Sequence, residues 1–424
     1  MTAALRLSNK DQAMLDGDFG AAAQIAMRIL ITMANVYEAQ EMLDIESAHI
    51  DGCLYHGDSG IDFAVKLVDG GAQVVVPTTL NVGAIDLLHP EDFQGSAVQA
   101  AKAQRLMALY QQMGCQPVWT CAPYQAYQRP TLGAQIAWAE SNAIVFANSV
   151  LGARTNRYGD FIDICAAITG RVPAFGLHLK ENRCGQILFT LEGIPERLLH
   201  DDVLYPVLGY FIGEHSGNQI PVIDGLPSTT SEDQLKALGA SSATSGAVAM
   251  FHAVGITPEA PTLAQAFCGR EPATRIKVTL DSLKAKLDKL STVPDGEIDV
   301  VALGSPHYSL AEFAVLMARL TEITLNPETQ FVVCTNRLVL AGLKERGWLA
   351  KLESAGVQLV VDTCVVVAPI TRVREGVLMT NSGKFAHYAP GNIGLQVVFG
   401  SLEECLRSAE IGRVWRDKRL WDVI

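Results

Sequence analysis

Three cysteines lie beside or within apolar runs of the sequence, and a thiolate could act there as a nucleophile or a metal ligand. Cys53 lies in "DGCLYHGDSG" (51–60), Cys121 in "WTCAPY" and Cys364 in "VVDTCVVVAP". A free cysteine usually packs as a small hydrophobic side chain, and the local sequence favours that interpretation for Cys121 and Cys364. For Cys53 it leaves four roles open: a buried thiol, a nucleophile, a metal ligand or part of a phosphate-binding loop.

Hydrogen-bond donors gather in two turns of the second half. In "LGSPHYS" (303–309), Ser305 and His307 precede a helix expected to begin near Ser309, whose N–H groups would attract an anion. An ordinary loop with a serine N-cap is the simpler interpretation. In "MTNSGKFAHYAPG" (379–391), Ser382 and Lys384 could hold a carboxylate, or the segment is a solvated turn. It lacks the spacing of a P-loop, so no nucleotide is expected there.

Polar side chains also interrupt an apolar helical pattern in "AWAESNAIVFANSVLGARTNRYGD" (137–160). Glu140, Ser141 and Asn142 open this stretch. Buried polar groups require partners, and a substrate can be one of them.

The elements that must position these residues alternate between strand and helix patterns. Apolar runs at 72–81 and 116–124 indicate strands, and the runs at 298–313, 330–336 and 357–369 alternate with helical stretches. This predicts a doubly wound, mostly parallel sheet in the second half. Ligands collect outside the carboxyl ends of such strands, where Ser305, His307 and Cys364 would lie. We expect a break near residue 225, giving the regions 1–225 and 226–424.

Composition excludes several classes of partner. The net charge is −12, and no Lys/Arg cluster alternates with aromatic residues, so neither nucleic acid nor an anionic membrane is expected. The N-terminus lacks a signal-peptide pattern and no apolar run is long enough to span a bilayer, which favours a cytoplasmic protein. The nine cysteines include no CxxC pair, so a disulfide framework is not expected.

Seven segments, taken together, resemble the aconitase X family in order along nearly the whole chain. They are "IESAHIDG", "VPTTLNVG", "TCAPY", "IAWAESNAIVFANSVLGARTNR", "FGLHLKENR", "DTCVVVAP" and "TNSGKFAHYAPG". The resemblance implies an aconitase-like α/β fold, with mostly parallel sheets and flanking helices in two or three subdomains around a central cleft. It also implies a smaller swivelling domain, which is fused in some members and a separate subunit in others.

No segment of this sequence matches the swivelling domain. We therefore expect a separate small subunit and a heterodimer. In aconitase relatives that domain carries a serine that acts as base, so this chain alone would lack one catalytic group.

The resemblance implies a hydro-lyase with an iron–sulfur cluster. Expelling hydroxide from an unactivated carbon requires a Lewis acid, and proton removal beside a carboxylate requires a base and fixed donors. By resemblance, we assign catalytic roles to Glu140, Ser141 and Lys384. The substrate-binding residues implied are Gly52, Leu54, Asn81, Ser305, His307 and Ser382.

One departure from the family pattern affects the cluster. Many members have Gly-Cys-Pro-His where this sequence reads "LGSPH", so Ser305 replaces a usual ligand, and serine binds iron poorly beside thiolates. Cys53 stands where the phosphomevalonate branch typically reads Gly-Val-Ser-Tyr. The implied ligand set is therefore Cys53, Cys121 and Cys364, which favours a two-iron cluster.

The same exchange bears on the substrate. It resembles the hydroxyproline branch, which dehydrates cis-3-hydroxy-L-proline to Δ1-pyrroline-2-carboxylate in hydroxyproline catabolism. Ser382 and Lys384 would hold the carboxylate of this small hydroxy amino acid, and Glu140 would face its amine. The alternatives are a dehydratase of another 3-hydroxy acid, such as a phosphomevalonate, and a non-catalytic subunit without a cluster.

Overall fold

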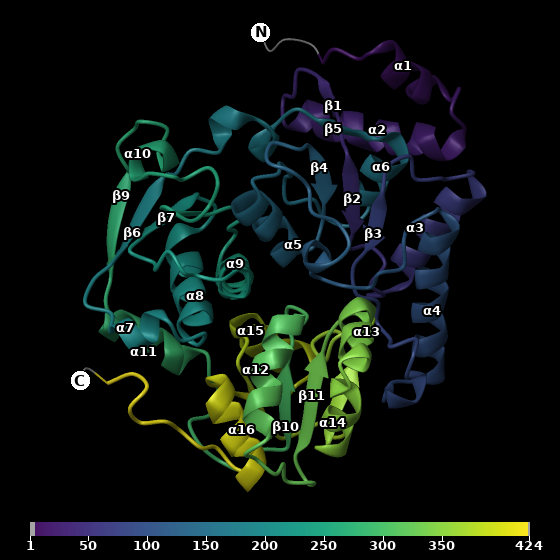
Figure 1. Cartoon of the computed structure of the whole chain (residues 1–424). Coiled ribbons are helices and arrows are strands. Elements are labelled where there is room, and N and C mark those ends of the chain that lie inside the picture. Colours follow the sequence, from purple (N-terminus) through teal and green to yellow (C-terminus); the bar gives the residue numbers. More distant parts are fainter. Residues whose placement is uncertain (1–4, 423–424) are drawn as a thin grey trace. The chain divides into compact units, whose positions relative to one another are not determined.

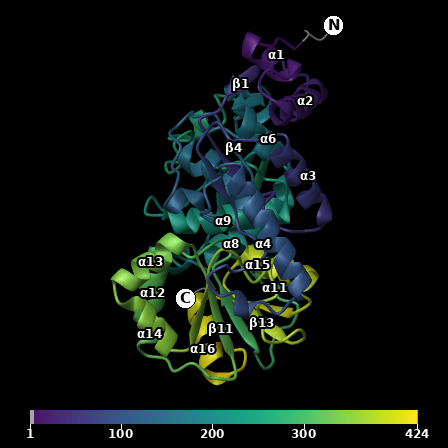
Figure 2. The same cartoon turned by 90° about the vertical axis from the view of Figure 1, so that its right-hand side faces the viewer.

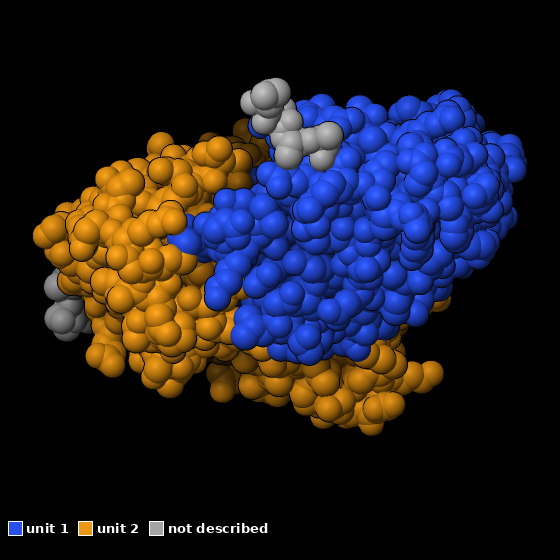
Figure 3. Space-filling view, turned by 90° about the horizontal axis from the view of Figure 1, so that it is seen from above, with its two compact units in different colours: residues 1–85, 96–184 blue, residues 86–95, 185–424 orange. Residues whose placement is uncertain are grey.

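The computed structural model describes residues 5–422, which form two compact units (Figure 3). Unit 1 comprises the chain up to residue 85 together with residues 96–184, and unit 2 comprises residues 86–95 and the chain from residue 185 onward. This boundary precedes the break expected near residue 225. The reason is that β7 (Pro221–Asp224), before the expected break, pairs with the strand at His252–Ala253 after it, so both sides of the break lie in one sheet.

Unit 1 contains a three-stranded parallel sheet in the order β3-β2-β4, formed by β2 (Ser47–Ile50), β3 (Thr78–Leu80) and β4 (Ile136–Trp138) (Figure 1). A second, antiparallel pair joins β1 (Met42–Asp44) to β5 (Arg171–Pro173). The helices are α1 (Asn9–Asp16), α2 (Ala21–Val36), α3 (Asp58–Asp69), α4 (Ala97–Gln112), α5 (Ser141–Phe146) and α6 (Ile162–Thr169). The π-helical segment Ala147–Leu151 continues α5, as the helical spacing of this stretch predicted.

The first sheet of unit 2 is also parallel, in the order β8-β7-β6-β9, with β6 (Ile187–Leu191) beside β7 and with β8 (His252–Ala253) and β9 (Thr274–Val278) at its edges. Its helices are α7 (Glu196–Leu199), α8 (Leu204–Ser216), α9 (Glu232–Ser245), α10 (Leu263–Ala266) and α11 (Leu280–Lys289). Helices α8 and α9 pack closely, because a Cβ on Gly209 would lie only 2.2 Å from the carbonyl oxygen of Leu238. The run of small residues that begins at Gly239 forms the last turns of α9.

The second sheet of unit 2 confirms the predicted doubly wound arrangement. Its five parallel strands, in the order β12-β11-β10-β13-β14, are β10 (Val300–Leu303), β11 (Gln330–Cys334), β12 (Val357–Val360), β13 (Val377–Thr380) and β14 (Gln396–Phe399). The helices are α12 (Leu310–Leu320), α13 (Arg337–Glu345), α14 (Trp348–Ser354), α15 (Gly383–Asn392) and α16 (Leu402–Ile411). Figure 2 shows α12, α13 and α14 together on one side of this sheet.

Two predicted strands are shorter than expected. Only Thr78–Leu80 of the run 72–81 forms a strand, and the run 116–124 contributes one isolated bridge, between Thr79 and Gln116, before a 3-10 turn at Pro123–Gln125. Prolines at 117 and 123 explain the second difference, since proline has no N–H to donate to a sheet.

Seven cysteines are free and buried, as expected for most of them: Cys53, Cys115, Cys121, Cys165, Cys334, Cys364 and Cys405. The other two, Cys184 and Cys268, are disulfide-bonded, which composition did not predict.

Within residues 5–422 no single helix is long and apolar enough to cross a membrane. The pair α1 and α2 meets the length and composition criteria only together, with a bend of 118° between them.

The strand orders mark where ligands are expected. In the three-stranded sheet the order reverses at β2, which has β3 on one side and β4 on the other. In the five-stranded sheet it reverses between β10 and β13. The loops that leave neighbouring strands at such a point diverge, and they open a crevice at the carboxyl edge of the sheet.

Candidate active site

In unit 1, all the predicted site residues lie in loops or helix starts at the carboxyl edge of the three-stranded sheet. They are Gly52, Cys53 and Leu54 after β2, Asn81 after β3, Cys121 after the bridge to β3, and Glu140 and Ser141 after β4. The sheet therefore gathers this part of the predicted site at its reversal point.

The loop that carries Cys53 is held by Asp163 of α6. The Asp163 carboxylate accepts hydrogen bonds from the backbone N–H groups of Asp51 at 2.7 Å and Gly52 at 3.4 Å. Burial raises the pKa of Asp163 to about 7. A Cβ on Gly52 would lie 2.6 Å from the Tyr110 hydroxyl oxygen, so only glycine fits this bend.

The thiol of Cys53 points into the protein. Its Sγ lies 3.3 Å from the carbonyl oxygen of Asn81, 3.5 Å from that of Ile50 and 3.8 Å from that of Val82. Burial, with Asp51 and Asp163 nearby, raises the pKa of Cys53 well above its usual value. In this arrangement Cys53 is a neutral thiol that donates to a carbonyl.

Two buried amide oxygens at this edge lack a partner among the described residues: Oδ1 of Asn81 and Oδ1 of Asn142. The Asn81 side chain donates to the Asp51 carboxylate through Nδ2. Nδ2 of Asn142 donates to the carbonyl oxygen of Cys121 at 3.0 Å and to the Tyr124 hydroxyl at 2.9 Å. Unpaired buried acceptors are costly, so the edge is suited to a ligand that donates hydrogen bonds.

Glu140 caps the helix that follows β4. One carboxylate oxygen accepts from the N–H of Ala143 at 2.7 Å, and the other lies 3.4 Å from the Ser141 hydroxyl. The Glu140 backbone adopts a φ of 71°, which is unfavourable for a residue with a Cβ. Strain of this kind is often retained where a side chain must point into a site.

In unit 2, the remaining predicted residues lie at the carboxyl edge of the five-stranded sheet. Ser305 and His307 follow β10, Cys364 follows β12, and Ser382 and Lys384 follow β13. The Ser382 hydroxyl donates to the carbonyl oxygen of Ser305, so the two turns beside the reversal point are bonded to each other.

His307 is fully buried, and its Nε2 lies 3.1 Å from the carbonyl oxygen of Thr363. Burial lowers the pKa of His307 to about 4, which keeps the ring neutral. The ring therefore ties the turn after β10 to the loop that presents Cys364.

A pocket of about 270 Å³ opens beside the Ser305 and Ser382 turns. Besides Ser305, Asn381 and Ser382, its lining includes Asp202, Asp233, Lys236 and Glu312. Sequence reasoning missed Lys236, Asp233 and Glu312, as it missed Asp163. One feature of the sequence could have pointed to Lys236: it is the only charged residue in "LKALGASSA", which otherwise contains small and apolar residues.

The donor chemistry of the three predicted cysteines fits an iron–sulfur cluster, although no metal-binding group is assembled within residues 5–422. No group of three or more His, Cys, Asp or Glu side chains in that range could hold a metal ion. Cys53, Cys121 and Cys364 form no disulfide; Cys53 and Cys364 follow parallel strands, and Cys121 follows the isolated bridge at Gln116. Cys53 fits least well, because its thiol donates to backbone carbonyls.

Family models match almost all of the chain. The first domain of aconitase X matches residues 4–181, the second domain residues 185–288 and the third domain residues 298–411. The chain belongs to the aconitase X family. The start of the matched second domain coincides with the boundary between the two units at residue 185.

Two relatives are cis-3-hydroxy-L-proline dehydratases. The protein from Pseudomonas aeruginosa is 46% identical over 411 residues, a match that covers 96% of this chain and 70% of that protein. The protein from Hypocrea jecorina is 40% identical over 409 residues, covering 96% of this chain and 68% of that protein.

Another relative is named as a large subunit, and a further match is a solved structure. The phosphomevalonate dehydratase large subunit of Methanothermobacter thermautotrophicus is 36% identical over 405 residues, covering 95% of this chain and 98% of that protein. The crystal structure of Thermococcus kodakaraensis aconitase X in its holo-form superposes with a TM-score of 0.86 at 33% identity, over 96% of this chain and all of that one. These matches establish the predicted α/β fold and make this aconitase X chain a hydro-lyase.

Proposed function

We propose that this chain is the large subunit of a hydro-lyase that converts cis-3-hydroxy-L-proline to Δ1-pyrroline-2-carboxylate and water. The observation that carries the proposal is the order of similarity. Identity is 46% and 40% to two cis-3-hydroxy-L-proline dehydratases, against 36% to a phosphomevalonate dehydratase large subunit.

The charges around the unit 2 pocket support an amino acid over a phosphorylated acid. Lys236 is the only cation among the described residues that line it, and Asp233 and Glu312 both pair with its ammonium group. With Asp202, the lining has three carboxylates for one ammonium. A phosphate would therefore find no uncommitted cation in this lining.

The two charged groups of this substrate are assigned to different residues. Ser382 and Lys384 would hold its carboxylate, and the Glu140 carboxylate would accept from its ammonium. The unpaired Oδ1 atoms of Asn81 and Asn142 are further acceptors for its donors. A fixed carboxylate and ammonium orient the ring so that the proton on C2 and the hydroxyl on C3 leave in one defined geometry.

Loss of the C2 proton and the C3 hydroxyl gives one water molecule and an enamine, which tautomerises to Δ1-pyrroline-2-carboxylate. Cys53, Cys121 and Cys364 would hold an iron–sulfur cluster, for which we favour two irons. When bound, such a cluster supplies the Lewis acid that makes the C3 hydroxyl a leaving group.

The name of one relative supports the proposed separate small subunit. This chain covers 98% of the phosphomevalonate dehydratase large subunit, whereas it covers 70% and 68% of the two hydroxyproline dehydratases.

Anaerobic co-expression with a candidate small subunit tests the proposal. The purified complex should be brown, contain iron and release water from cis-3-hydroxy-L-proline. A brown complex that acts only on a phosphomevalonate would replace the proposed substrate with the second candidate. A colourless, iron-free and inactive complex would favour a non-catalytic subunit.

A further inference from the structure

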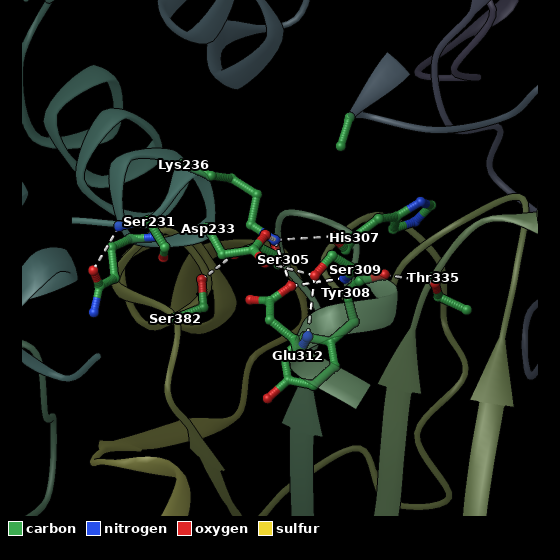
Figure 4. A network of polar contacts seen from close by, with 12 residues as sticks. Ser231, Asp233, Lys236, Ser305, His307, Tyr308, Ser309, Glu312, Thr335 and Ser382 are labelled. Atoms are coloured by element: carbon green, nitrogen blue, oxygen red, sulfur yellow. Dashed lines mark hydrogen bonds and ion pairs between the residues drawn. The ribbon is translucent and has the colours of Figure 1, made fainter. Parts of the chain in front are cut away.

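A cluster of three charged side chains around the buried Lys236 lies in the pocket wall, and the residues assigned to the dehydration do not include it (Figure 4). Lys236 of α9 has a side chain only 2% exposed. Its Nζ lies 2.8 Å from Oδ1 of Asp233 and 2.5 Å from Oε2 of Glu312 on α12. A third contact, at 3.4 Å, reaches the carbonyl oxygen of His307.

The carbonyl of His307 belongs to the turn that carries Ser305. The same turn is fixed elsewhere by Tyr308, whose N–H donates to the carbonyl oxygen of Cys334 at 3.0 Å and whose carbonyl accepts from the Thr335 hydroxyl at 2.8 Å. Those partners belong to the five-stranded part of unit 2. Lys236 instead reaches the turn from α9, which belongs to the four-stranded part.

The carboxylates beside Lys236 hold the end of the same turn. The Ser309 hydroxyl donates to Asp233 at 2.6 Å, and the Ser309 N–H donates to Glu312 at 2.7 Å. The ammonium group thus neutralises two carboxylates that both bind Ser309. Without it, two half-buried carboxylates would repel each other beside the turn.

We propose that Lys236 is a positioning residue for the dehydration. Held between Asp233 and Glu312, it binds the His307 carbonyl and fixes the 304–309 turn. That turn supplies the Ser305 carbonyl to which the Ser382 hydroxyl is bonded. Lys236 therefore sets the position of the Ser382 hydroxyl without touching the substrate.

This inference rests on the proposed function, because Ser382 is there assigned to the substrate carboxylate. The first test is a double-mutant cycle between Lys236→Met and Ser382→Ala in the two-subunit enzyme, with kcat and KM measured for each variant. We expect Lys236→Met to lower kcat/KM by about 100-fold, as displacements of about 1 Å do. Ser382→Ala should then cost little more on that background.

Lys286→Met is the matched control. Lys286 also pairs with a glutamate, Glu214, in unit 2, but neither residue lines the pocket. This variant should retain kcat/KM within about threefold. Additive losses in the cycle, or a Lys236→Met enzyme as active as the control, would overturn the proposal.

Lys236→Met leaves two half-buried carboxylates without a cation and could fail to fold. The triple variant Asp233→Asn, Lys236→Met, Glu312→Gln removes all three charges together and keeps the side-chain volumes similar. A folded triple variant with wild-type kcat/KM would contradict the positioning role, whereas a folded variant with reduced kcat/KM would support it.

Hydrogen exchange separates this inference from the proposed substrate. Exchange of the amides in residues 304–309 should accelerate at least tenfold in the triple variant and remain unchanged in Lys286→Met. This readout needs no substrate, so it holds even if cis-3-hydroxy-L-proline is not turned over. Unchanged exchange of the 304–309 amides would overturn the proposal.

Discussion

The Ser382 hydroxyl bonds the two turns that flank the reversal point of the five-stranded sheet. It donates to the carbonyl oxygen of Ser305 and accepts from the N–H of Phe385 at 3.1 Å, which makes it the N-cap of α15. One side chain thus fixes both the start of a helix and the loop beside the pocket. Stability and substrate binding should respond together when it is removed.

Replacing Ser382 with alanine should reduce both the free energy of unfolding and kcat/KM. Loss of the N-cap should lower the free energy of unfolding by about 1 kcal/mol. Loss of the side chain that fixes the turn assigned to the substrate carboxylate should lower kcat/KM by about 100-fold. Urea unfolding and steady-state kinetics on the same preparations measure the two effects.

Thr279→Ala is the control for capping alone. Thr279 caps α11 by accepting from the N–H of Ser282 at 3.3 Å, and it does not line the pocket. Thr279→Ala should lower the free energy of unfolding by a similar amount to Ser382→Ala and leave kcat/KM unchanged. If Ser382→Ala loses no more activity than Thr279→Ala, Ser382 serves only to cap its helix.

Replacing Cys53 with serine tests its assignment as a cluster ligand. A serine hydroxyl can still donate to the carbonyl oxygen of Asn81, which now lies 3.3 Å from the sulfur, so the fold should be retained. Serine is a poor ligand for iron compared with a thiolate. We therefore expect the iron content and visible absorption of the anaerobic complex to fall to less than about half of wild type, with loss of activity.

Cys165→Ser is the matched control, since Cys165 is another free, fully buried cysteine of unit 1. It should keep the full iron content. A Cys53→Ser enzyme with as much iron and activity as Cys165→Ser would leave Cys53 as a buried thiol, the role that its present contacts also fit.

Glu312 should make the folded state less stable as the pH rises. Burial raises its pKa from 4.5 to about 7. The folded state therefore keeps a proton that the unfolded state releases, so the free energy of unfolding falls as pH rises between these two values. The side chain is 23% exposed, which screens part of the effect, so about 1–3 kcal/mol is expected. Glu312→Gln should lose this pH dependence.

The partners of Glu312 do not titrate in that window. The pKa of Asp233 lies below 3.8, where Lys236 helps to hold it, and the pKa of Lys236 lies above 10.5. Urea unfolding at pH 5 and pH 8 should therefore show the wild-type slope in Asp233→Asn and a smaller slope in Glu312→Gln. Equal slopes in wild type and Glu312→Gln would show that Glu312 is ionised throughout this range.

The sequence predicts three strands of the five-stranded sheet, β10, β11 and β12, because buried parallel strands are continuous apolar runs separated by helical patterns. It also places Ser305 at the end of β10 and Cys364 beyond β12, whereas β13, which precedes Ser382, and β14 were not predicted. A residue's position at a strand end depends only on where the apolar run of that strand stops, so this part of the candidate site could be predicted from the local sequence.

Residues that act across elements could not be predicted in this way. Lys236 lies on a helix face otherwise lined with small and apolar residues, and its partner Glu312 is on a different helix. Asp163 likewise begins an apolar helix, and its role appears only when that helix packs against the Gly52 bend. Long-range pairing of charges leaves no periodic signal in a single sequence.

Gly304 offers a test of how closely the turn after β10 must approach its neighbour strand. It adopts a φ of 88°, and a Cβ there would lie 2.1 Å from the carbonyl oxygen of Cys334. That oxygen also accepts the Tyr308 N–H, so it cannot move without loosening the turn. Gly304→Ala should therefore displace the turn, and both the free energy of unfolding and kcat/KM should fall.

Gly347→Ala separates the steric clash from backbone strain. Gly347 also has a positive φ, of 65°, but a Cβ there would meet no atom beyond its chain neighbours within 4 Å. Gly347→Ala should lower the free energy of unfolding by about 1–2 kcal/mol, the usual penalty for a residue with a Cβ in the left-handed conformation, and should leave activity intact. Gly304→Ala should cost at least about 2 kcal/mol more, because it adds overpacking to that strain. Urea unfolding measures the loss of free energy in both variants. Equal losses would mean that the end of β11 moves to accommodate the methyl group. The turn after β10 would then be less tightly fixed than its contacts indicate.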